Sequence, residues 1–155
     1  MNYILIFAFG IGVVAGLRAL TAPAAVAWAA HSGSLHLQDS ALAFMTSTWS
    51  VIIFSALAIF ELVGDLLPKT PKRTAPGPLA ARIITGALCG ACVCASANQS
   101  PPIGAALGAL GAVAGAFAGY ELRKRLVTAL NIKDLFIAIP EDLIAIGLAL
   151  FFVTR

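Results

Sequence analysis

The sequence predicts an all-α integral membrane protein, a bundle of about five transmembrane helices in a single domain, residues 1–155. Of its 155 residues, 60% are hydrophobic and 11% are charged, so the charges are too few to cover the surface of a soluble domain. The apolar residues also fall into runs near the length that crosses a bilayer. The net charge of +3 is too small to indicate a nucleic-acid partner.

Five apolar segments predict the spans: residues 3–20, 49–67, 79–97, 102–120 and 135–153. Each would form about 27 Å of helix, enough for a hydrocarbon core of about 30 Å. The first apolar run continues to residue 30, which is too long for one helix. Thr21 and Pro23 indicate a stop and a restart, so we expect a break near Pro23, and Pro140 predicts a second break. Residues 31–48 are expected to form an external loop with a turn around Leu42–Met45.

Basic residues gather at two of the predicted connections. These are Lys69, Lys72, Arg73 and Arg82 at the second connection, and Arg123, Lys124, Arg125 and Lys133 at the fourth. With five crossings, these connections share a side with the N-terminus, and Arg155 lies on the other side. The positive-inside rule then predicts a cytoplasmic N-terminus and an external C-terminus.

The fourth segment carries a stripe of glycines. Gly104, Gly108, Gly111, Gly115 and Gly119 recur at spacings of three or four residues, which places them on one helix face. Such a face lets another helix approach closely. Two interpretations remain open: packing within one protomer, or the seam of a homo-oligomer.

Several stretches of the sequence are similar to a known family. They are "GLRALTAP", "ELVGDLLPKTPKRTAPGPLAARIITGAL", "AGAFAGYELRKRL" and "EDLIAIGLAL". Together they resemble the bacterial membrane-protein family called domain of unknown function 4126, from Gly16 to about Phe152, and residues 61–88 are the most specific part. The resemblance implies a small multi-helix protein of the bacterial inner (plasma) membrane. It brings no catalytic residue, binding residue or cofactor.

Acidic residues near the cytoplasmic helix ends form the first candidate site. Glu61 and Glu141 each lie about 9 Å inside a predicted helix end, with Asp65 and Asp142 nearby and Arg82 about 5 Å deep. Fully ionised, this layer would carry a charge of about −3 and would attract cations or hold protons. The sequence therefore predicts an ion or proton site, with the identity of any metal left open.

Structural explanations compete with that site. "IPEDL" is an ordinary helix start, with Pro140 at the first position and acids at the positive end of the helix dipole. Asp65 could be an interfacial acid paired with Lys69 or Arg82. Glu61 could be a structural ion-pair partner, although a carboxylate within a membrane usually has a partner or a function.

Basic residues form the second candidate site, for anions or lipids: Arg18, Lys69, Lys72 and Arg73. The proline-rich loop that holds the last three is expected to contact lipid headgroups. Arg18, placed toward the outer face beside the break, could snorkel to lipid phosphates, bind freed carbonyls or hold an anionic substrate. Direct pairing of Arg18 with Glu61 is not expected, because their predicted depths differ.

No catalytic signature is readable, so we do not expect an enzyme. Cys89, Cys92 and Cys94 are expected to pack in the bundle rather than bind a soft metal, and no cofactor is expected. The leading hypothesis is a cation- or proton-coupled transporter or channel-like protein that works as a homo-oligomer. The alternative is a non-transporting membrane scaffold or lipid-binding protein, and an anion or phospholipid carrier using Arg18 ranks third.

Overall fold

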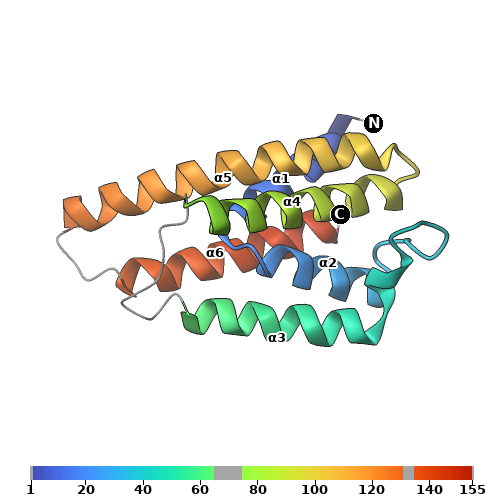
Figure 1. Ribbon diagram of the computed structural model, residues 1–155, viewed down its shortest axis with the longest axis horizontal. Helices are drawn as coiled ribbons and strands as arrows, with labels where there is room; N and C mark the ends of the chain where they lie inside the picture. The colour runs from blue at the N-terminus through green and yellow to red at the C-terminus, as the bar shows by residue number, and fades with distance from the viewer. Residues whose placement is uncertain (1, 65–74, 131–134, 155) are drawn as a thin grey trace.

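The computed structural model describes residues 2–64, 75–130 and 135–154. Within these ranges the chain is all-helical, which confirms the predicted fold class (Figure 1). The elements are α1 (Asn2–Leu17), α2 (Thr21–His31), a 3-10 turn η1 (Ala43–Thr46), α3 (Thr48–Gly64), α4 (Pro76–Ser96), α5 (Pro101–Leu130) and α6 (Leu135–Val153). The turn η1 and the start of α3 agree with the predicted loop over residues 31–48.

Glycine contacts hold α1, α4 and α5 together. Gly12 of α1 and Gly86 of α4 both lie against Gly108 of α5, and a Cβ at any of the three would collide with backbone atoms of its neighbour. Gly111 packs in the same way against the backbone of Phe9. The glycine stripe of α5 is therefore buried inside the protomer, where it permits close helix packing.

The direction of each helix follows from these contacts. Gly12 lies against Gly108 and Gly16 against Ala112, so α1 runs parallel to α5. Gly90 lies against Gly104, whereas the earlier Gly86 lies against Gly108, so α4 runs antiparallel to α5.

The first apolar run is interrupted in the structure. Helix α1 ends at Leu17 and α2 begins at Thr21, so residues 18–20 form the break. The predicted break is thus present, a few residues earlier than Pro23. Pro23 lies in the first turn of α2, where its missing N–H removes no helical hydrogen bond.

After the break the chain turns back instead of crossing the bundle. Gly10 lies against Phe152 and Arg18 contacts Asp142, so α1 is antiparallel to α6, and both chain termini lie at one end (Figure 1). Helix α2 returns toward that end, where the N–H of His36 bonds Ser96 near the close of α4. The start of α1 therefore lies at the end of the bundle opposite Arg123, which differs from the predicted arrangement, because α1 and α2 form a hairpin instead of one crossing.

The predicted break at Pro140 is also wrong, because α6 continues through this residue. Proline fixes φ at a helical value and removes one backbone donor, so a helix supported by its neighbours can continue through it. The bounds of α6, Leu135–Val153, coincide with the last predicted segment.

Two helices of the described ranges, α4 and α5, are long and apolar enough to cross a membrane, while α1 and α3 are shorter apolar helices. The count of five spans is therefore not confirmed. Helix α5 has 30 residues, about 45 Å, and extends well past the predicted end at residue 120. The reason is that Glu121 to Arg125 end the apolar run while remaining good helix formers.

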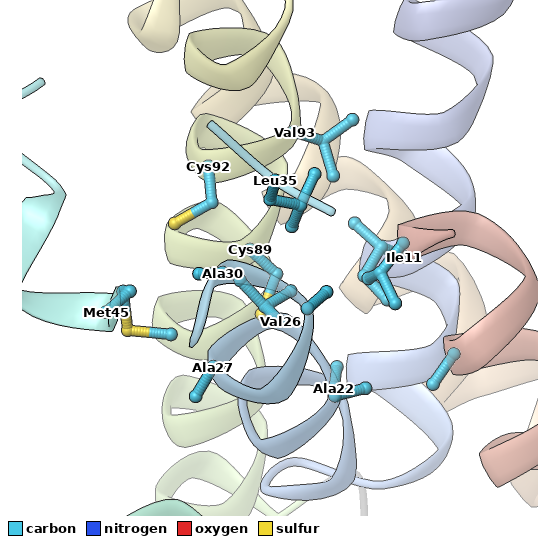
Figure 2. Close-up of a cluster of buried hydrophobic side chains, with 14 of the residues drawn as sticks. Ile11, Ala22, Val26, Ala27, Ala30, Leu35, Met45, Cys89, Cys92 and Val93 are labelled. Atoms are coloured by element: carbon cyan, nitrogen blue, oxygen red, sulfur yellow. The ribbon is translucent and has the colours of Figure 1, made fainter. Parts of the chain in front are cut away.

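Helix α2 lies against a buried core shared by several elements. Figure 2 shows Val26 of α2 close to Cys89 of α4, with Ile11 of α1 and Met45 of η1 at the edges of the cluster. Cys89, Cys92 and Cys94 are buried thiols without disulfides, as the packing interpretation expects. Among the described residues, no group of three or more His, Cys, Asp or Glu could hold a metal ion.

Candidate functional site

The break between α1 and α2 brings Arg18 into the protein interior. Its backbone N–H bonds the carbonyl of Val14 at 2.7 Å and closes the last turn of α1, and its side chain is 1% exposed. The guanidinium donates to Asp142 Oδ1 through Nε at 2.7 Å, and Nη2 bonds the same oxygen. Nη1 donates to the backbone carbonyl of Glu61 at 3.4 Å. Arg18 therefore connects α1 with α3 and α6.

Glu61 binds the other side of the break. Its Oε1 accepts the N–H of Ala19 and its Oε2 accepts the N–H of Leu20, both at 2.8 Å. Leu20 precedes α2 and offers no side-chain cap, so the carboxylate of α3 satisfies donors at the start of this helix. A negative charge there also opposes the positive end of the helix dipole.

Arg82 approaches Glu61 from α4. Its Nη2 lies 3.8 Å from Glu61 Oε1, and the residue is 5% exposed. The desolvation of such a guanidinium is costly unless an opposite charge lies near it. Glu61 thus serves two kinds of donor, the backbone of the break and the cation of α4.

A third ion pair lies close to these residues and connects α5 with α6. Arg123 Nη1 of α5 is 3.6 Å from Glu141 Oε2 of α6, and both side chains are mostly buried. We call the six residues the charged centre: Arg18, Glu61, Arg82, Arg123, Glu141 and Asp142. Three bases face three acids, so the formal charge of these described residues is zero.

These six residues are neutral together, whereas the predicted layer of about −3 counted Asp65, which lies outside the described residues, and did not count Arg18 or Arg123. The prediction assigned Arg18 to the opposite depth, because it assumed that residues 3–20 cross the bundle. The hairpin brings Arg18 to the acids instead, and α5 continues far enough for Arg123 to reach Glu141. The expected field that would attract a cation is therefore absent from the described part of the chain.

The structure unites some of the predicted site residues. Glu61, Arg82 and Asp142 come together as expected, and Glu141 lies beside them on α6. Arg18 belongs to the same centre, so the expectation that it snorkels outward is wrong. The predicted contacts Asp65, Lys69, Lys72 and Arg73 lie outside the described residues.

Sequence reasoning missed Arg123 as a member of the site, because it treated this residue only as a topology signal. Arg18 is the residue from which the centre could have been predicted, because an arginine inside an apolar run requires a counter-charge. Its partner Asp142 is 124 positions away, so no local pattern identifies it.

The fold and this site define a small all-helical bundle built around a buried, charge-balanced centre at a helix break. The chain belongs to the family described as Domain of unknown function (DUF4126), whose model matches residues 5–154. This result confirms the resemblance seen in the sequence. No match was found among curated proteins, and none among solved structures.

Proposed function

We propose that the protein spans the bacterial inner membrane through α3, α4, α5 and α6, with α1 and α2 forming a hairpin that enters and leaves from one side. Large apolar side chains on the outside of the bundle support a lipid environment, among them Trp49 and Phe60, which are 73% and 76% exposed. The described basic residues Arg82, Arg123, Lys124 and Arg125 lie toward the end of the bundle opposite both ends of the described chain. By the positive-inside rule, both termini are then external.

Within that membrane protein, we propose that the charged centre is the proton-binding site of a small transporter. The observation that carries this proposal is the contact of the Glu61 carboxylate with the N–H groups of Ala19 and Leu20 at the helix break. Discontinuous helices at membrane depth are a recurring site of substrate and ion binding in transporters.

Protonation of Glu61 would change the forces at the break. The carboxylate faces Arg82 of α4 and the two backbone donors. The guanidinium of Arg18 donates to the backbone carbonyl of Glu61 and to Asp142 of α6. A neutral Glu61 loses its attraction to Arg82 and half of its acceptor capacity.

Helix α3 is the element that could respond to this change. It packs chiefly against α2 and η1, and Val51 is its buried residue. Polar contacts along one side hold it, including the bond from Trp28 Nε1 to Ser55 Oγ at 3.0 Å and the contacts of Glu61. Release of Glu61 would therefore loosen the end of α3 that lies at the centre.

The test is proton flux into reconstituted vesicles that contain a pH-sensitive dye. We expect a pH gradient to dissipate faster with the wild type than in protein-free vesicles, and the effect to fall at least about tenfold in Glu61→Gln. Glu121→Gln is the matched control, because Glu121 pairs with Arg125 on an exposed face of α5. Normal flux in a folded Glu61→Gln protein would contradict the proposal.

A second candidate is a non-transporting membrane scaffold or lipid-binding protein. The observation that favours it is the pairing of all six members of the charged centre, which is also what a purely structural clasp requires. In that case the wild type conducts no protons above the background. Glu61→Gln would then alter thermal stability alone, with no preference among salts at equal ionic strength.

A further inference from the structure

The described contacts of the Glu61 carboxylate are with hydrogen-bond donors and a cation. Ala19 and Leu20 give backbone N–H groups, and Arg82 gives a buried guanidinium. Thr21, the first residue of α2, follows Leu20 in the chain and has a hydroxyl group. That hydroxyl is fully buried and makes no hydrogen bond in the described structure, and Thr21 as a whole is only 7% exposed.

An unsatisfied buried hydroxyl is costly, and the start of a helix already favours an anion. Glu61 therefore fills only part of the donor capacity of this turn. The Glu61 carboxylate belongs to α3, whereas the donors belong to the break, to the start of α2 and to α4. The occupant can thus leave while the donors stay in place.

We propose that the helix break before α2, with Thr21 and Arg82, is the binding site for a small monocarboxylate anion that exchanges with the Glu61 carboxylate. This inference rests on the proposed transport function and names its substrate class. Two N–H donors, each 2.8 Å from a different oxygen of one carboxylate, match the planar geometry of that group.

Charge decides how such an exchange couples to protons. The charged centre is neutral with Glu61 ionised, so a second anion would leave it with one uncompensated negative charge. If Glu61 takes up one proton as the substrate carboxylate takes its place, the net charge is unchanged. One proton then enters with one monoanion, and a divalent anion such as sulfate would not be balanced.

Chemical rescue tests the site without any assay of transport. Glu61→Ala removes the internal carboxylate and leaves the donors of Ala19, Leu20 and Thr21. We expect formate or acetate to raise its unfolding temperature in detergent by about 4 °C or more over chloride at equal ionic strength. Adding Thr21→Val should remove most of that rise, and Glu121→Ala should show none.

A measurement on the wild type covers the case in which Glu61→Ala does not fold. Formate should stabilise the wild type more than chloride does, and this preference should grow as the pH is lowered, because each anion that binds in the exchange brings one proton with it. Thr21→Val should weaken the preference at low pH. No preference for formate over chloride in either experiment would overturn the anion site.

The two proposals fail separately. Carboxylate rescue in a protein that shows no proton flux above that of protein-free vesicles, even with acetate present in the assay, would support the site and remove the transport function. Proton flux without rescue would keep the transport function and overturn the monocarboxylate as its substrate. Uptake of radiolabelled acetate driven by a pH gradient, lost in Thr21→Val, is the result expected when both hold.

Discussion

Arg18 lies in the middle of an apolar run, and its guanidinium is buried against Asp142 at the point where the first helix ends. A buried ion pair contributes little net stability when compared with an apolar pair, because both charges lose their hydration. Removing one partner is far more costly, since it leaves a buried charge uncompensated. Arg18 and Asp142 should therefore behave as one unit.

At this scale we predict that Asp142→Asn lowers the free energy of unfolding by about 3–5 kcal/mol, because Arg18 keeps its charge and loses its counter-ion. Denaturant or thermal unfolding of the purified protein in detergent measures the loss. In the double variant with Arg18→Gln, the loss should be smaller than the sum of the two single effects. Additive losses would show that the two residues act independently.

Among the helices, the close packing of α4 on α5 requires glycine, which has no side chain, at the points of contact. A Cβ at Gly108 would strike the backbone of Gly86, and backbone cannot move aside as a flexible side chain can. Gly147 of α6 has nothing within 4 Å of the position of its Cβ. The two glycines therefore serve as test and control for the same substitution.

We predict that Gly108→Ala destabilises the bundle by about 1–3 kcal/mol, because α4 and α5 must separate to admit the methyl group. Gly147→Ala should be neutral or stabilising by up to about 1 kcal/mol, since alanine is the better helix former. Thermal unfolding of both variants, with helix content checked by circular dichroism, gives the comparison. Equal stability of the two would show that the close contact at Gly108 is not required.

At the scale of the whole molecule, the hairpin of α1 and α2 changes the topology that a count of apolar runs gives. Both termini lie at the same end of the bundle, together with residues 32–47 (Figure 1). The exposed basic residues Lys124 and Arg125 lie toward the other end of α5. An odd number of crossings would separate the termini, whereas the fold keeps them together.

We predict that single cysteines introduced as Asn2→Cys, Ser34→Cys and Thr154→Cys all react with a membrane-impermeant maleimide from the external side. Lys124→Cys should react only after the membrane is opened. The three native cysteines are buried and should stay silent, which the parent protein tests directly. Labelling at residue 154 with protection at residue 2 would restore the five-span topology.

The all-α class, the family and most helix positions could be predicted from the sequence, because they depend on local patterns. Apolar runs set the helices, Thr21 and Pro23 marked the break to within a few residues, and the spacing of the α5 glycines identified a contact face. Glu61, Arg82 and Asp142 were also found as site residues, since a charge in an apolar segment needs a local explanation wherever its partner lies.

The direction of the first helix, and through it the charge of the six-residue centre, depends on tertiary contacts. Hydropathy reports that a segment avoids water, and a hairpin of α1 and α2 satisfies that demand as well as a full crossing does. The choice depends on contacts such as Arg18 with Asp142, which are distant along the chain and leave no local pattern. Their pairing turned a predicted negative layer into a neutral centre around the break.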